Sequence, residues 1–516
     1  MKKPLLLSLA TIAILGTTNL SAESMYDQFQ AMKIEMQKMK KELEELKSKQ
    51  HTVVAHKKED KASVNAKKMA SADDESDDEG DDEEMTVKEQ LADIQDSISD
   101  LNKNTNGNHI KLSVDYRFAL DNLQYKMADG STQKNNAFMT NRLWINMNWA
   151  ATKHLSFTGQ IAYNKAFGAR SGASTNNGYE TFDWIANENA YDDTLRIRSA
   201  YFLYKNDTFM GTDVPWTFSV GRRPSTNGHL VNLRDDDHAA SPMGHNINVE
   251  FDGLSAKFAL ENVTGVDGMY VKFCAGRAMS NAAPRFNTAP YADTTSNASI
   301  DLLGLIFTPW SDGQYTVNTQ YYFANNLIDG NTTGTGFDTV GNMHAITANF
   351  VANGIGDGIN DFLDDTIFFI SGAMSITEPD QGQGMLGSTT SQKGYSEWVG
   401  VQYPSLISEE GRWGLEYNHG SKYWRSITYG EDTNIGSKLA TRGDAYEAYF
   451  TEPLIEDILS LQIRYTYIDY KYTGSNGFFG NTSGNAMSMD EAIAAGQGAN
   501  VVDSAQDIRF YLRYRY

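Results

Sequence analysis

The sequence has little cysteine and proline, and it has no long apolar run beyond its first residues. Its one cysteine, Cys274, cannot form an internal disulfide, and proline accounts for 10 of 516 residues. After the N-terminal run, no stretch approaches the roughly 20 consecutive apolar residues that a membrane-spanning helix needs. A helical membrane protein is therefore excluded. A long exported chain without disulfides must be stabilised by burial of side chains or by closure of a sheet.

The sequence also lacks an excess of positive charge and the common catalytic motifs. Its formal net charge is −22, so nucleic acid is not an expected partner. It contains no Gly-x-Ser-x-Gly, His-Glu-x-x-His or phosphate-binding Gly-x-x-x-x-Gly-Lys-Ser/Thr motif, and its nine histidines are scattered. We therefore expect no catalytic residue, no metal site and no cofactor. An enzyme that hides isolated catalytic residues is the less favoured alternative.

The N-terminal residues have the pattern of an export signal. Two lysines precede an apolar run from Leu5 to about Gly16, and small residues follow up to Ala22. This order is typical of a secretory signal peptide, here residues 1–22, with cleavage after Ala22. A membrane anchor is the alternative, but the apolar run is too short for a spanning helix.

Two segments with heptad spacing follow the signal. In both segments apolar residues recur at alternating intervals of four and three, which predicts coiled-coil seams and self-association. A helix packed against a domain would show a wider apolar stripe. The first seam, in residues 23–50, consists of Met25, Phe29, Met32, Met36, Met39, Leu43 and Leu46. The second, in residues 85–104, consists of Val87, Leu91, Ile94, Ile98 and Leu101.

Residues 51–84, between the two seams, form a charged segment. A lysine-rich stretch is followed by the acidic run SADDESDDEGDDEE. Blocks of like charge repel one another and remain solvated, so this segment is predicted to be a disordered linker. Calcium binding is the alternative, but the spacing of carboxylates and glycine does not fit an EF-hand loop.

Residues 108–516 alternate between apolar and polar side chains in segments separated by Gly, Asn, Asp and Ser. This period of two is that of β-strands. The connections alternate between short and long, as periplasmic turns and extracellular loops do in outer-membrane barrels. One segment, NINVEFDGLSAKFALEN, predicts a tight hairpin with its turn at Asp252-Gly253. The alternation of connections fails once, between Val263 and Ser299, where one more strand restores it.

These patterns predict an all-β fold, a transmembrane antiparallel β-barrel of about 18 strands, with 16 strands as the alternative. With aromatic and aliphatic side chains facing lipid, the opposite face of each strand points into the lumen. Isolated charges there either select solutes or are merely solvated. The predicted basic pore-lining residues are Arg117, Arg142, Arg196, Arg198, Arg223, Arg464, Arg509, Arg513 and Arg515. The predicted acidic ones are Glu250, Glu261, Glu416 and Glu447.

The C-terminal segment DIRFYLRYRY predicts the strand that closes the barrel. It alternates aromatic or aliphatic residues with arginines, and an unpaired edge cannot be left in lipid. We expect it to pair with the strand that begins near Ile110. Its outward aromatic residues form the predicted signal for the barrel-assembly machinery, namely Phe510, Tyr514 and Tyr516.

The export signal, the heptad helix with its charged linker, the segment GRRPSTNG and the aromatic C-terminal strand together resemble an uncharacterised porin-like family of Gram-negative bacteria. In that family a periplasmic coiled coil precedes the barrel. The resemblance implies an outer-membrane barrel of porin type, surrounded by outer-membrane lipid and, by analogy with porins generally, associated as a homotrimer. It does not indicate a solute.

The resemblance to porins also gives a role to the third long loop. In general porins this loop commonly folds into the barrel, with its acidic residues opposite basic residues of the wall. The expected constriction residues here are Arg234, Asp235, Asp236 and Asp237. An exposed acidic loop is the alternative.

The expected function is passive diffusion of small hydrophilic solutes or ions through the barrel. Separated charges along a water-filled lumen sort solutes by charge and size. A structural role is the alternative, in which the barrel is an anchor and the coiled coil tethers the outer membrane to peptidoglycan.

Overall fold

The computed structural model describes most of the region in which strands are predicted. The predicted signal peptide (1–22), both coiled-coil segments (23–50 and 85–104) and the charged linker (51–84) lie outside the described residues. The described ranges are 110–168, 194–285, 288–292, 298–330, 337–356, 358–428, 431, 433–473 and 485–516.

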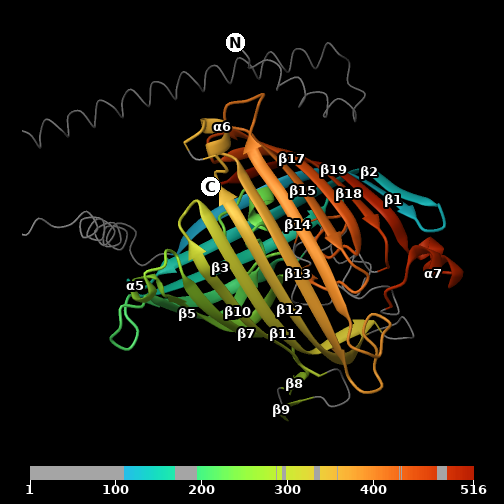
Figure 1. Ribbon diagram of the computed structural model, residues 1–516, viewed down its shortest axis with the longest axis horizontal. Coiled ribbons are helices and arrows are strands. Elements are labelled where there is room, and N and C mark those ends of the chain that lie inside the picture. The colour runs from blue at the N-terminus through green and yellow to red at the C-terminus, as the bar shows by residue number, and fades with distance from the viewer. Residues whose placement is uncertain are drawn as a thin grey trace, which may run out of the picture. The chain divides into compact units, whose positions relative to one another are not determined.

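Sixteen strands form one antiparallel sheet that closes on itself (Figure 1). Consecutive strands are neighbours throughout, and the predicted β-barrel is thereby confirmed. The barrel strands are β1 (Lys111–Met127), β2 (Thr132–Ala150), β3 (Leu155–Ala166), β4 (Arg196–Asn206), β5 (Trp216–Ser225), β6 (Ile247–Ala259), β7 (Tyr270–Met279), β10 (Ile300–Ser311), β11 (Tyr315–Gly330), β12 (Phe337–Asn353), β13 (Ile367–Pro379), β14 (Lys393–Pro404), β15 (Arg412–Gly420), β17 (Gly443–Ile455), β18 (Leu459–Tyr470) and β19 (Val502–Arg515).

The remaining elements are short and lie in the connections. Strands β8 (Ala282–Arg285) and β9 (Thr288–Ala292) form a separate hairpin between β7 and β10. The two-residue strand β16 (Ile427–Thr428) pairs in parallel with β6. Among the described residues, no helix is long and apolar enough to cross a membrane. The helices are α4 (Val231–Asp235), α5 (Glu261–Thr264), α6 (Asp361–Asp364), α7 (Met489–Ala494) and the 3-10 helix η2 (Gly498–Asn500).

The expected hairpin turn at Asp252-Gly253 is wrong, and with it the larger strand count. Strand β6 runs through both residues without turning. Gly253 pairs with Gly221 of β5 on one side and with Gly276 of β7 on the other. A Cβ on Gly253 would lie 2.3 Å from the carbonyl oxygen of Ala275. Glycine is therefore needed here for close approach of neighbouring strands, not for a turn, and the barrel has 16 strands.

The first and last strands close the barrel. Their pairing runs from Asp115 opposite Arg515 to Met127 opposite Val502. It continues one step further, because the Val114 amide donates to the Tyr516 carbonyl at 2.7 Å and the Tyr516 amide donates to the Val114 carbonyl at 2.9 Å. The predicted closure by the C-terminal strand is confirmed.

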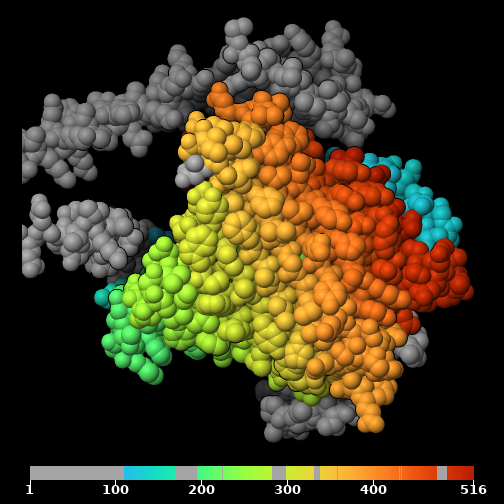
Figure 2. Space-filling model, viewed as in Figure 1, coloured from blue at the N-terminus to red at the C-terminus, as the bar shows by residue number. Residues whose placement is uncertain are grey.

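The outward face of the barrel wall is apolar. Large apolar side chains alternate with inward polar ones and remain exposed, for example Leu112 (67%), Leu303 (54%) and Ile508 (53%). A soluble protein rarely exposes so many apolar side chains side by side, whereas the lipid-facing surface of a membrane barrel does. Figure 2 shows one such face, on which strands β10 to β18 lie next to one another in chain order. The fold is an outer-membrane type β-barrel.

The buried core lies inside the barrel. Because the wall is a single sheet, inward side chains are buried only where something fills the lumen beside them. The largest buried apolar cluster combines residues of β6, β10, β11 and β12 with residues from loops. Its members are Ile247, Val249, Phe251, Ile300, Leu302, Tyr322, Ala324, Leu327, Ile328, Val340, Met343, Ala345, Met385 and Ile427.

Deleting Tyr516 is expected to reduce assembly of the barrel in membranes more than it changes the conductance of barrels that do assemble. The deletion removes both backbone hydrogen bonds to Val114. It also removes an aromatic side chain that is 80% exposed, and exposed aromatic side chains of this kind form belts at the membrane–water interface. The folded fraction can be measured from the heat-dependent shift in electrophoretic mobility after folding into lipid vesicles. Tyr516→Phe is the matched control and should assemble normally. Wild-type assembly of the deletion variant would contradict the role given to this residue.

Candidate functional site in the barrel lumen

Within the described part of the chain, two long loops turn back into the lumen. The first inserted loop comprises residues 226–246 between β5 and β6 and contains α4. The second inserted loop comprises residues 421–442 between β15 and β17 and contains β16; its residues 429, 430 and 432 lie outside the described part of the chain. In an antiparallel barrel β5 and β15 run in the same direction, so both loops enter from the same rim.

One end of the first inserted loop is held by β11, β13 and β14. The Met243 amide donates to the side-chain oxygen of Gln320 at 2.9 Å. The ring nitrogens of His245 lie 2.8 Å and 2.9 Å from the hydroxyl oxygens of Ser371 and Ser396. Burial lowers the pKa of His245 to about 3, so the ring is neutral at neutral pH, and one of its nitrogens accepts a hydrogen bond.

The helix α4 of the same loop reaches a different part of the wall. Gln462 of β18 donates to the carbonyl oxygen of Arg234 at 2.7 Å. Arg513 of β19 donates to the carbonyl oxygen of Asp235 at 2.6 Å. The first inserted loop is thus fixed to β11, β13 and β14 at one end and to β18 and β19 at α4, which means that it crosses the lumen.

The second inserted loop packs against the first. In the β16–β6 pair, Ile427 lies opposite Ile247, directly after the first inserted loop. Arg425 of the second loop is fully buried, and its guanidinium lies 3.1 Å from the carboxylate of Asp329 at the end of β11. Backbone pairing and a buried ion pair therefore fix the second loop inside the barrel as well.

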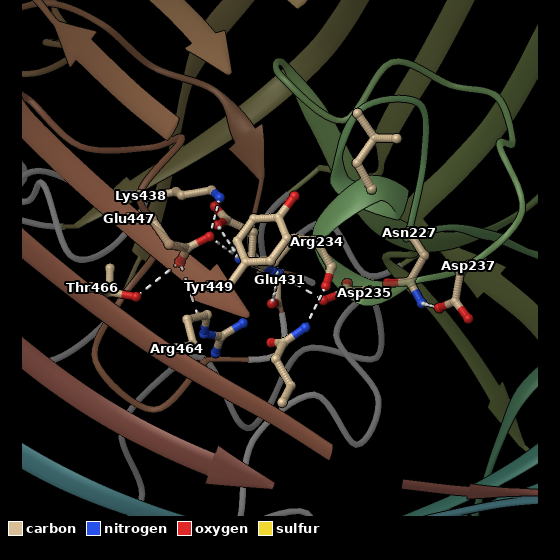
Figure 3. A network of polar contacts seen from close by, with 12 residues as sticks. Asn227, Arg234, Asp235, Asp237, Glu431, Lys438, Glu447, Tyr449, Arg464 and Thr466 are labelled. Atoms are coloured by element: carbon tan, nitrogen blue, oxygen red, sulfur yellow. Dashed lines mark hydrogen bonds and ion pairs between the residues drawn. The ribbon is translucent and has the colours of Figure 1, made fainter. Parts of the chain in front are cut away.

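A buried group of charges, the central charge cluster, joins both loops to β15, β17 and β18 (Figure 3). The Lys438 ammonium lies 2.6 Å from the Glu416 carboxylate and also contacts Glu447. Arg234 of the first loop lies 3.6 Å from the Glu447 carboxylate, and Arg464 of β18 lies 3.9 Å from it. Each of these side chains is at most 3% exposed. Two carboxylates thus face three cations.

Glu431 supplies a further carboxylate from the second inserted loop. Its side chain lies 3.7 Å from the Arg234 guanidinium and accepts hydrogen bonds from the Ser437 hydroxyl and, at 3.1 Å, the Leu439 amide. Burial raises the pKa of Glu431, and the charges of Arg234 and Lys438 oppose that rise. With this residue, the central charge cluster has three carboxylates for three cations.

A second group of charges, the rim cluster, joins the first inserted loop to the closing strands. It lies near the start of β1 and the end of β19. The Arg513 guanidinium lies 2.5 Å from the Asp115 carboxylate and 2.9 Å from the Asp237 carboxylate. The Arg515 guanidinium lies 2.6 Å from the Asp236 carboxylate. Acidic residues of the loop therefore contact arginines of the wall. Burial raises the pKa of Asp237, while the charge of Arg513 opposes that rise.

The other inward arginines also face carboxylates. Arg509 lies 2.5 Å from Asp121, and both side chains are almost fully buried. Arg198 of β4 lies 2.8 Å and Arg222 of β5 lies 3.2 Å from the same carboxylate, that of Glu250. Each of these three arginines thus lies beside a carboxylate.

Aromatic rings lie beside two further arginines, one on β1 and one on β2. The Arg142 guanidinium lies 3.4 Å from the centre of the Trp144 ring and 3.4 Å from the Asp115 carboxylate. The Arg117 guanidinium lies 5.5 Å from the centre of the Tyr511 ring of β19. Both arrangements have the geometry of cation–π contacts.

Three residues singled out in the sequence lie elsewhere than in these clusters. Glu261 is not on a strand, so its assignment to the lumen is wrong; it begins the short helix α5 in the turn after β6, where its carboxylate accepts from the Gly268 amide at 3.2 Å. Arg196 begins β4, and its guanidinium donates to the Thr194 hydroxyl at 3.2 Å. Arg223 lines a separate pocket in the wall.

Several residues of the clusters were missed in the sequence. Asp115 and Asp121 of β1 share the inward face with Arg117, so the same alternation could have identified them. Lys438 and Glu431 come from a loop without periodicity, and no sequence signal indicated them. Among the described residues no group of three or more His, Cys, Asp or Glu side chains could hold a metal ion. What the lumen offers is paired charge and hydrogen-bonding groups.

A comparison of the sequence with known protein families finds a match. A family described as a protein of unknown function, DUF3373, matches residues 132–516, which include β2 to β19. The chain belongs to the DUF3373 family. The comparison with curated proteins finds no match.

Solved structures with a similar chain trace are bacterial barrels. An anion-selective porin from Comamonas acidovorans has a TM-score of 0.45 at 10% identity, covering 79% of this chain and 99% of that one. OprB of Pseudomonas putida has a TM-score of 0.44 at 13% identity, covering 82% and 97%. OmpT of Vibrio cholerae has a TM-score of 0.41 at 14% identity, covering 79% and 97%. The closed barrel itself rests on the strand pairing described above.

Proposed function

We propose that this DUF3373 protein is an outer-membrane channel through which small hydrophilic solutes or ions diffuse passively. The observation that carries the proposal is a closed 16-strand barrel whose lumen is lined by paired charges and narrowed by two loops. Barrels of this strand number enclose enough space for an aqueous channel, and loops that fold inward set how much of it is open.

The pairing of cations with carboxylates in the two clusters supports selection of solutes by their size and polarity. Each arginine of the rim cluster, and each cation of the central charge cluster, lies within 4.0 Å of a carboxylate. A lumen of alternating, paired charges presents hydrogen-bonding groups to water and solute without a strong net field. Hydrophilic solutes, which can form hydrogen bonds with these groups and with water in the lumen, are therefore favoured over apolar solutes.

The proposal includes the parts of the chain that precede the barrel. We place a cleavable signal at residues 1–22 and a periplasmic coiled coil at residues 23–50, and we propose a homotrimer. The support is the heptad spacing of both seams. The aromatic residues of β19 support recognition by the barrel-assembly machinery.

Planar lipid bilayers test the proposal. The purified full-length protein, folded in detergent, should produce discrete steps of ion current. Absence of steps from a preparation that is fully folded by its electrophoretic mobility would contradict the channel. If removal of residues 25–49 then detached the outer membrane from the cell wall in cells, the tethering function would be favoured instead.

Neutralising Asp235, Asp236 and Asp237 together, each to Asn, is expected to shift the reversal potential in a salt gradient toward anion preference. The change removes the loop carboxylates that face Arg234, Arg513 and Arg515, so the field beside the first inserted loop becomes more positive. Asp207→Asn, an exposed change in the turn between β4 and β5, is the control and should leave the reversal potential unchanged. An unshifted potential in the triple variant would show that ions do not pass beside these residues.

A further inference from the structure

A pocket lies in the barrel wall beside the first inserted loop. It holds about 580 Å³ of space free of atoms, part of it continuous with solvent. Its walls come from β5, β6, β7, β10 and β11, and Ser241 and Pro242 of the first inserted loop cover it.

The pocket contains two cations and no acidic residue. Arg223 of β5 and Lys272 of β7 both line it, and its lining includes neither Asp nor Glu. The Lys272 side chain donates to the Ser241 hydroxyl at 2.8 Å, and the residue is only 8% exposed. Arg223 donates to the hydroxyl of Ser255 at 3.1 Å and lies 4.6 Å from the centre of the Tyr201 ring.

The partners of Arg223 and Lys272 differ from those of the cations in the two charge clusters. Their cations meet carboxylates of the wall or of the loops, whereas no ion pair within the described residues involves Arg223 or Lys272. Buried charge is costly unless an opposite charge compensates it. Hydroxyl groups solvate the two cations but do not neutralise them, so the pocket has a positive charge that an anion would balance.

The rest of the pocket lining is largely apolar. Phe251 of β6 lies over Gly276 of β7, where a Cβ would come within 2.2 Å of the phenyl ring. The other apolar lining residues include Ile247, Leu302 and Ile306. A ligand that matches both the two cations and the apolar lining residues has one anionic group and a small apolar body. Inorganic phosphate would leave the apolar residues without a partner.

We propose that this pocket is a binding site for small organic anions, with Arg223 and Lys272 holding the anionic group and the apolar lining residues beside them receiving the apolar body. An arginine presents paired donors that match a carboxylate, and the lysine adds a second charge. The use of the site for selecting solutes rests on the proposed channel function, while binding itself does not.

Isothermal titration calorimetry with the folded full-length protein in detergent tests the site. Benzoate is the probe; benzamide has the same shape without the charge, and inorganic phosphate has the charge without the apolar body. Benzoate should bind saturably and at least about tenfold more tightly than benzamide, since a charge-assisted hydrogen bond contributes at least that factor. It should also bind more tightly than phosphate, which leaves the apolar lining unfilled.

Variants assign the binding to the pocket. Lys272→Gln and Arg223→Gln should each weaken benzoate binding by about tenfold or more, and Lys272→Arg should restore most of it. Lys134→Gln, which removes an exposed charge from β2, should change nothing. Unaltered benzoate affinity in the double variant Arg223→Gln with Lys272→Gln would overturn the site. Equal binding of benzoate and benzamide, or of benzoate and phosphate, would overturn the assignment of an organic anion.

Bilayer measurements on the same preparation separate this inference from the proposed function. Benzoate binding that depends on Lys272, in protein without current steps, would support the site and contradict the channel. Current steps in protein that does not bind benzoate would support the channel and overturn the site.

Discussion

Replacing residues 229–243 with a short glycine-serine linker is expected to raise the single-channel conductance several-fold. These residues form most of the first inserted loop, which crosses the lumen from β11 and β14 to β18 and β19. Without them, only the second inserted loop still narrows this part of the lumen, and a 16-strand barrel is wide enough to enclose an aqueous channel. Single-channel recordings of both proteins under the same salt conditions give the ratio.

The matched control for this loop replacement is a change in a loop that does not enter the lumen. Substituting Glu409 and Glu410, two exposed residues of the turn between β14 and β15, with glutamine should leave the conductance unaltered. A loop-replaced protein that is correctly folded and conducts no better than the wild type would show that the first inserted loop does not limit the pore.

Glu447→Leu is expected to lower the free energy of unfolding by about 3–5 kcal/mol, the usual cost of removing one partner of a buried ion pair. Glu447 contacts Lys438 and lies within 3.9 Å of Arg464 and 3.6 Å of Arg234. With leucine at this position, these three buried cations have one fewer carboxylate to balance their positive charge. Urea unfolding in lipid vesicles, followed by tryptophan fluorescence, measures the loss.

An exposed ion pair provides the control for this stability change. Asp301→Asn removes the partner of Arg277 on the outside of the wall, where the two side chains are 38% and 51% exposed. Exposed pairs contribute at most about 1 kcal/mol, so this variant should unfold close to the wild type. If Glu447→Leu were equally mild, the central charge cluster would not be holding the two loops in place.

Alternation of side chains along single strands was sufficient to predict the barrel and its closure. In β1, Arg117 alternates with the outward residues Tyr116 and Phe118, and this pattern depends only on neighbours in the sequence. The strand count was overestimated because Asp252-Gly253 has the composition of a turn. Its glycine is required instead by the strands on either side, which are distant in the sequence from one another.

The loops are the part of the site that periodicity could not predict. Arg234 and the three aspartates after it were assigned to a constriction by resemblance to porins, not from their own spacing. Lys438 and Glu431 have no periodic context, and they acquire their roles only because the second inserted loop packs beside β6. Contacts of this kind depend on which chain segments meet inside the closed barrel, and that information is not local.

The most direct test of the channel is solute uptake by liposomes that contain the full-length protein. Liposomes loaded with an impermeant polysaccharide and diluted into an iso-osmotic solution of a small hydrophilic solute, such as glycine or arabinose, swell only if the solute enters. We expect swelling at a rate that falls as the solute becomes larger and that rises when residues 229–243 are replaced. Liposomes with correctly folded protein that swell no faster than protein-free ones, with every solute, would contradict the proposed function.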